Sequence, residues 1–105
     1  MKTVTLSYPR SEGARFDMDY YLKTHMKMVT DGVGDACRSI TVETGEGDAA
    51  PFATVRFVVD SMEAFGAAMA PYNAKFQGDM ANYTDVRPVM HVSALAIDHA
   101  PARAA

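Results

Sequence analysis

The sequence predicts an α+β domain whose four strands form one antiparallel sheet with both helices on one face. The chain has 105 residues, which suits a single domain. Apolar residues recur at every second position in some segments and at every third or fourth in others, which separates strands from helices. These segments follow the order strand, helix, strand, strand, helix, strand. That order is typical of the ferredoxin-like βαββαβ arrangement.

The beginning of the chain predicts a strand followed by a helix. Polar and apolar side chains alternate in residues 3–8, and Pro9 ends the pattern because proline cannot continue the hydrogen bonds of a strand. Asp17 suits the N-cap of a helix, since its carboxylate can accept hydrogen bonds from the first free N–H groups. Gly32 and Gly34 predict the end of this helix.

The middle of the chain predicts two strands joined by a turn. Residues 38–44 alternate and have one polar face, which indicates a strand at the edge of the sheet. Residues 45–48 contain two glycines and indicate the turn. Residues 52–59 are mostly apolar on both faces, as expected of a central strand.

A second helix and a last strand complete the pattern. The helix is expected to begin at Asp60 and Ser61, whose side chains can cap it. Pro71 lies inside the apolar stripe that follows, so it predicts a kink or a division of the helix. Residues 78–85 are expected to form a loop, and residues 89–97 the last strand.

Residues 1–99 are predicted to form one domain, and residues 100–105 a flexible tail rich in small side chains. Two helices on one face leave the other face of the sheet uncovered, and we expect that face to carry Val, Ile and Phe side chains. Packing against a second copy of the chain would bury this face and stabilise so short a chain. The sequence therefore predicts a homodimer.

The composition argues against several classes of function. Ten Lys and Arg against 13 Asp and Glu give a net charge of −3, with no basic cluster to bind nucleic-acid phosphates. No apolar run approaches the roughly 20 residues that a membrane-spanning helix needs. A single cysteine, Cys37, cannot form an internal disulfide, which fits a cytoplasmic location. Scattered histidines and the lack of a phosphate-binding loop predict neither a metal site nor a cofactor.

His25 is the main candidate for chemistry, because it lies within the apolar stripe of the first predicted helix. An imidazole can take up or release a proton near neutral pH. Tyr21 lies one turn earlier on the same face, so its hydroxyl can sit beside the ring. We therefore predict His25 and Tyr21 as catalytic residues. The alternative is a buried histidine whose hydrogen bonds are satisfied within the core.

Further side chains could line a mainly apolar pocket with a few polar points, as small-molecule sites do. Each has a structural explanation as well. The tyrosines suit core positions with a hydrated hydroxyl, and the Arg and His of the strands suit the seam between two copies. The predicted substrate-binding residues are Tyr8, Tyr20, Met28, Arg56, Phe65, Tyr72, Tyr83 and His91.

Several segments resemble the EthD family, small proteins associated with ethyl tert-butyl ether degradation. The resemblance rests on residues 8–9, 13–22 and 25–26, on residues 60–65, and on the block 82–89 that begins Asn-Tyr-Thr-Asp. It covers about residues 2–93 and implies a dimeric α+β barrel. Relatives with this fold bind aromatic or small organic substrates between the sheet and the helices.

The same resemblance implies that His25 is the main functional residue, with Tyr20 or Tyr21 beside it and Tyr83 near the mouth of the pocket. The chain departs from the family pattern at two positions. Lys27 stands where proline usually continues the histidine motif, and His91 stands where glutamine is common. Both departures bear on the substrate rather than on the fold.

These features predict a cofactor-independent enzyme, similar to oxidoreductases, isomerases or cyclases, that acts on a small organic or aromatic catabolic intermediate. His25 would be the general acid/base, a role that typically contributes about 10²- to 10⁴-fold to the rate. The alternative is a non-catalytic protein that binds a small hydrophobic ligand or protects an intermediate of a degradation pathway. A purely structural partner for another enzyme is a third hypothesis.

Overall fold

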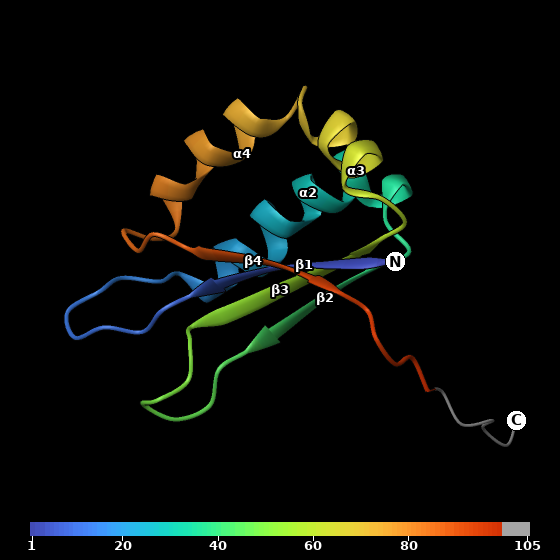
Figure 1. The fold of residues 1–105 in the computed structure, drawn as a ribbon. Coiled ribbons are helices and arrows are strands. Elements are labelled where there is room, and N and C mark those ends of the chain that lie inside the picture. Colours follow the sequence, from blue (N-terminus) through green and yellow to red (C-terminus); the bar gives the residue numbers. More distant parts are fainter. Residues whose placement is uncertain (100–105) are drawn as a thin grey trace, which may run out of the picture.

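The computed structural model describes residues 1–99 and contains one antiparallel sheet with the helices on one side of it (Figure 1). The predicted order of elements and the ferredoxin-like fold are confirmed. The strand order across the sheet is β2-β3-β1-β4, which confirms the predicted edge position of residues 38–44 and the predicted central position of residues 52–59. The strands are β1 (Lys2–Tyr8), β2 (Ser39–Thr44), β3 (Ala53–Val59) and β4 (Val89–Ala94). The predicted tail, residues 100–105, lies outside the described residues.

The register of β1 and β3 determines which side chains face the helices. Leu6 lies opposite Val55, and Tyr8 lies opposite Ala53. Side chains directly opposite each other in an antiparallel pair project to the same face. The apolar residues of both central strands therefore meet under the helices and form the core.

The first helical segment consists of α1 (Met18–Tyr20), a π-helical turn η1 (Tyr21–His25) and α2 (Met26–Val33). Asp17 caps it as predicted, because its carboxylate accepts a hydrogen bond of 3.1 Å from the Tyr20 N–H. The α-helix ends at Val33 with Gly34 as its C-cap, as predicted. Gly34 keeps helical backbone angles and begins a 3₁₀ turn, η2 (Gly34–Ala36), so the chain becomes extended only at Cys37.

The second helical segment is divided near Pro71, as predicted, into α3 (Met62–Met69) and α4 (Asn73–Asp79). Ser61 caps α3 by accepting a 3.1 Å hydrogen bond from the Ala64 N–H. The predicted loop over residues 78–85 is wrong at its start, because α4 runs to Asp79 and continues into a 3₁₀ turn, η3 (Met80–Asn82). Helical structure persists there because Phe76 and Met80 both pack against the core.

The last strand is shorter than the predicted 89–97. Ala94 pairs with Lys2, the first residue of β1, and beyond that pair the Leu95 N–H donates one hydrogen bond of 3.1 Å to the Met1 carbonyl. No helix within residues 1–99 combines the length and the apolar character that crossing a membrane requires.

The uncovered face of the sheet is mainly polar, and the expectation of Val, Ile and Phe on it is wrong. Alternation places Ile40 and Val42 of β2 opposite Phe57 and Val55, so these apolar side chains all face the helices. The open face carries the intervening residues instead. They are Thr3, Thr5, Ser7, Ser39, Thr41, Glu43, Thr54, Arg56, Val58, Val89, His91 and Ser93.

Candidate functional site

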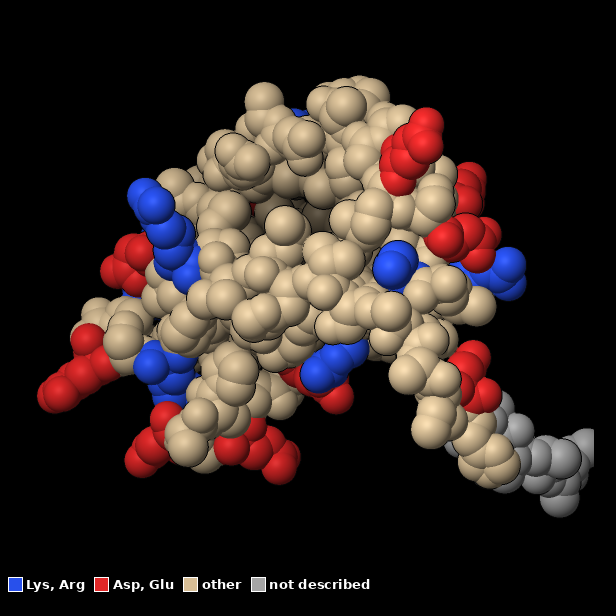
Figure 2. Space-filling model, viewed as in Figure 1, with Lys and Arg blue, Asp and Glu red and all other residues tan. Residues whose placement is uncertain are grey.

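A cleft of about 230 Å³ lies between the helices and the sheet. Figure 2 shows a hollow on the face of the molecule turned toward the viewer, and the residues around it are mainly other than Lys, Arg, Asp and Glu. Strands β1, β3 and β4, the π-helical turn, α2, α3 and α4 all contribute to the walls. The lining residues are Leu6, Tyr8, Tyr21, His25, Met26, Val29, Val55, Phe57, Met69, Asn73, Phe76, Gln77, Met80, Pro88 and Met90.

His25 lines this cleft and is hydrogen-bonded on its other side to Asp79. The distance from His25 Nδ1 to Asp79 Oδ2 is 2.8 Å, and only 5% of His25 is exposed. A carboxylate beside Nδ1 requires that nitrogen to carry its proton and to donate it. The pair therefore leaves Nε2 as the nitrogen that can accept a proton from another group.

Asp79 is itself held by two further donors, both at Oδ1. The Tyr20 hydroxyl donates a hydrogen bond of 2.6 Å, and Asn82 Nδ2 donates one of 2.9 Å. Burial raises the pKa of Asp79, but the hydrogen bonds from Tyr20, Asn82 and His25 outweigh burial and hold the pKa below its usual value. The carboxylate is therefore ionised at neutral pH and can stabilise a protonated His25 ring.

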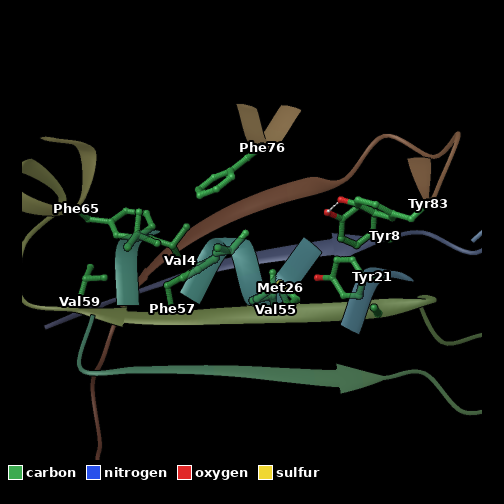
Figure 3. Packing of buried hydrophobic residues seen from close by; sticks show 13 residues of the cluster. Val4, Tyr8, Tyr21, Met26, Val55, Phe57, Val59, Phe65, Phe76 and Tyr83 are labelled. Carbon is green, nitrogen blue, oxygen red and sulfur yellow. Dashed lines mark hydrogen bonds between the residues drawn. The ribbon is translucent and has the colours of Figure 1, made fainter. Parts of the chain in front are cut away.

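Two tyrosines continue the network on the Nε2 side of the ring. The Tyr83 hydroxyl lies 3.4 Å from His25 Nε2 and shares a hydrogen bond of 2.8 Å with the Tyr8 hydroxyl (Figure 3). Burial raises the pKa of both tyrosines. Both hydroxyls are therefore neutral near pH 7 and can donate as well as accept. The chain Asp79, His25, Tyr83, Tyr8 offers a continuous path for a proton.

Tyr21 differs from its neighbours because its hydroxyl has no hydrogen-bond partner among the described residues. The residue is fully buried and its ring stacks on His25, with ring centroids 5.7 Å apart. In Figure 3 the hydroxyl points toward Met26 and Val55, which both line the cleft. Burial is the main cause that raises the pKa of Tyr21, and the neighbouring Tyr8 hydroxyl raises it further. A buried hydroxyl without a partner costs about 1–3 kcal/mol of stability.

The π-helical turn brings Tyr21 and His25 into the cleft together. The Met26 N–H donates to the Tyr21 carbonyl, five positions earlier in the chain. Each hydrogen-bonded turn therefore contains one residue more than a turn of an α-helix. Tyr21 and His25 are buried at the two ends of this turn, while the three residues between them are exposed. Turns of this kind occur frequently at functional sites, which agrees with the position of the two side chains.

No protein-family model and no curated protein matches this sequence, but solved structures do. An EthD-like protein from Ralstonia eutropha JMP134 is 42% identical, with a TM-score of 0.81 over 93% of this chain and 94% of that one. This chain belongs to the EthD-like family. The resemblance inferred from the sequence motifs is thereby confirmed.

More distant structures share the fold of this EthD-like chain. An ethyl tert-butyl ether degradation (EthD) family protein from Bacillus halodurans C-125 is 16% identical, with a TM-score of 0.64 over 90% of this chain and 96% of that one. A protein from Arabidopsis thaliana is 12% identical, with a TM-score of 0.64 over 94% of this chain and 98% of that one. At these identities the similarity establishes the fold alone.

The structure brings together about half of the residues predicted for the site of this EthD-like protein. Tyr8, Tyr21 and His25 line the cleft. Tyr83 lies against the histidine, and Tyr20 holds the carboxylate behind it. These five side chains come from β1, from the first helical segment and from the segment after α4, so the predicted cluster of tyrosines around His25 exists as one network.

The other predicted residues lie away from the cleft. Phe65 packs in the core, with its ring centroid 5.3 Å from that of Phe57. Tyr72 stacks on Phe76 and lines, with Met28, a separate depression on the outer surface of the helices. The remaining two are on the open face of the sheet, where Arg56 pairs with Glu43 and His91 lies in the exposed strand β4; both occupy register positions opposite Thr5.

Asp79 and its neighbour Asn82 have roles that the sequence analysis did not assign. Asp79 lies within the expected loop, and no spacing relates it to His25, from which it is separated by 54 positions. The Asn-Tyr-Thr-Asp block that carried part of the family resemblance begins at Asn82, so that block was the available signal for this region. Within residues 1–99, no three His, Cys, Asp or Glu side chains are grouped so that they could hold a metal ion.

Proposed function

We propose that this EthD-like protein is a cofactor-independent enzyme that acts on a small organic or aromatic molecule, with His25 as its general acid/base. The observation that carries the proposal is the buried 2.8 Å contact between His25 and Asp79 at the wall of an apolar cleft. A histidine so oriented can take up a proton at Nε2, either from a bound molecule or through the Tyr83 hydroxyl that lies 3.4 Å from this nitrogen. A structural histidine needs neither the cleft nor a carboxylate held ionised by two other donors.

The chemistry begins with removal of a proton from a hydroxyl or an activated C–H of the substrate by His25 Nε2. The resulting imidazolium is stabilised by the Asp79 carboxylate, which keeps its negative charge. The substrate retains the electron pair as an anion, and the Tyr21 hydroxyl can donate a hydrogen bond to it. Arg56, predicted from the sequence as a substrate-binding residue, lies on the opposite face of the sheet and cannot reach this anion.

Several reactions are open to such an anion, among them addition of O₂, isomerisation, cyclisation and elimination. Each leaves His25 protonated after the first step and requires that proton to return to product or solvent. The tyrosine pair Tyr83 and Tyr8 extends from Nε2 and provides a route for the return. An oxidoreductase role is therefore one member of a class that shares the same first step.

The experiment that tests the proposal compares wild-type protein with His25→Ala on a panel of phenolic, enolic and ether-derived catabolic intermediates. Substrate consumption is followed by chromatography, and proton abstraction by deuterium incorporation in D₂O. We expect a loss of about 10²- to 10⁴-fold in rate for His25→Ala. His99→Ala is the control, since that exposed histidine lies near the end of the described chain. Equal rates for folded wild-type and His25→Ala proteins would remove the mechanism.

A second candidate function is a non-catalytic binding protein for a small hydrophobic ligand, or an accessory protein that shields an intermediate. The apolar lining with few polar groups supports it, because ligand-binding clefts have this composition. Binding that survives His25→Ala, with no product and no deuterium incorporation in either protein, would favour this role over catalysis.

We also propose that the protein is a homodimer that works in the cytoplasm, where its single cysteine stays reduced. The apolar side chains on its surface support pairing. Val89, Met90 and Val92 of the edge strand β4 are 44%, 61% and 47% exposed. Residues of this kind on an edge strand favour association with another sheet.

A further inference from the structure

We propose that the cleft selects an uncharged hydroxyarene of one substituted ring or two fused rings, and that the Tyr21 hydroxyl is the contact that recognises the hydroxyl of the ligand. This inference deepens the function proposed above and rests on the same cleft. It adds a substrate class, the exclusion of carboxylated molecules and a specificity-determining residue.

The volume of the cleft limits the size of the ligand that it can hold. A volume of about 230 Å³ is below the range of roughly 300–1,000 Å³ typical for drug-sized ligands. It exceeds the roughly 150 Å³ of an engineered apolar cavity that binds benzene. The cleft therefore suits a molecule somewhat larger than a bare benzene ring.

The character of the walls favours an aromatic ligand. Phe57 and Phe76 contribute rings, and Met26, Met69 and Met80 contribute flexible thioether side chains. Aromatic rings pack well edge-to-face, and sulfur makes favourable contacts with ring edges. These contacts favour binding of a flat, polarizable molecule over binding of a compact aliphatic one.

The charges around the cleft disfavour an anionic ligand. None of the residues that line it within the described chain is Lys, Arg, Asp or Glu. The nearest fixed charge of the network is the ionised Asp79 carboxylate behind His25, and it would repel a ligand carboxylate. An unpaired carboxylate would also lose its hydration on entering apolar walls. An uncharged molecule is not repelled by the Asp79 carboxylate and has no ionic hydration to lose on entering the cleft.

The Tyr21 hydroxyl supplies the contact for a single polar group on the ligand. It is buried, lacks a partner among residues 1–99 and belongs to a residue that lines the cleft. The ring that carries this hydroxyl stacks on the ring of His25, which lines the same cleft. A ligand hydroxyl placed between them could accept from one and donate to the other. A hydrocarbon would leave the tyrosine unsatisfied.

The test measures binding of three matched probes by isothermal titration calorimetry at neutral pH: 2-naphthol, naphthalene and 2-naphthoate. We expect wild-type protein to bind 2-naphthol about three- to tenfold more tightly than naphthalene, the value of one added hydrogen bond. Binding of 2-naphthoate is expected to be weaker than that of 2-naphthol by about 100-fold or more. Tyr21→Phe should abolish the preference for 2-naphthol and leave naphthalene affinity unchanged, so naphthalene is the internal control for folding.

Three results would overturn the inference: no binding of 2-naphthol, binding of 2-naphthoate within tenfold of 2-naphthol, or an unchanged preference in Tyr21→Phe. The binding test is independent of turnover. If 2-naphthol binds as expected and the panel above shows no chemistry, the enzymatic proposal fails while this inference stands. If the panel shows His25-dependent chemistry and 2-naphthol does not bind, the enzyme stands and the substrate class is wrong.

Discussion

Tyr21→Phe is expected to stabilise the fold, although the residue it changes is fully buried. The variant deletes one oxygen and keeps the ring, which packs on His25, Tyr8 and Phe16. That oxygen has no hydrogen-bond partner among residues 1–99, so its removal relieves a desolvation cost.

The size of the effect follows from the cost of an unsatisfied buried polar group, about 1–3 kcal/mol. Part of the gain is offset because the missing oxygen leaves a small void beside the cleft. We expect the free energy of unfolding to rise by about 1 kcal/mol, which corresponds to an increase of roughly 4–8 °C in melting temperature for a domain of this size.

Tyr83→Phe is the matched control, because it deletes the same atom from an equally buried tyrosine. Its oxygen shares a 2.8 Å hydrogen bond with the Tyr8 hydroxyl, which the change would leave without that partner. We expect this variant to lose about 1–3 kcal/mol. Urea unfolding at one protein concentration, followed by circular dichroism, measures both changes. A destabilisation of Tyr21→Phe equal to that of Tyr83→Phe would refute the reasoning.

Two other predictions concern acid stability and assembly. The pKa of Asp79 in the folded state is lower than its ordinary value of 3.8. The hydrogen bonds to its carboxylate therefore stabilise the protein fully above pH 3.8, and this stabilisation is lost as the pH falls through the folded-state pKa. Asp79→Asn should therefore flatten the fall in unfolding free energy between about pH 5 and pH 2, measured by urea titration; an unchanged slope would contradict this assignment. Light scattering should give twice the mass of one chain for the wild type and one chain for Val92→Asp, and a monomeric wild type would exclude the homodimer.

Local patterns determine most of the fold because strand and helix periodicities are properties of neighbouring residues. The caps at Asp17 and Ser61 and the division at Pro71 follow from single side chains acting on adjacent backbone, and the structure confirms all three. The predicted ends of elements are wrong where contacts with residues far away in the sequence determine where the element stops. Strand β4 ends where its partner β1 begins at Lys2, and α4 continues because its apolar residues reach the core.

The sequence determined the fold class, the family and the cluster of His25 with Tyr8, Tyr20, Tyr21 and Tyr83. The apolar stripe that carries Tyr21 and His25 is visible in the spacing, and Tyr8 lies on the apolar face of the first predicted strand. The family resemblance placed Tyr20 beside His25 and Tyr83 near the mouth of the pocket. Which residue orients the imidazole was decided by tertiary structure, since Asp79 reaches His25 only when α4 packs over the π-helical turn. Exclusion of Arg56 and His91 from the cleft likewise depends on which face of the sheet the helices cover. Alternation assigns side chains to two faces, and only the packing of distant segments decides which face becomes the interior.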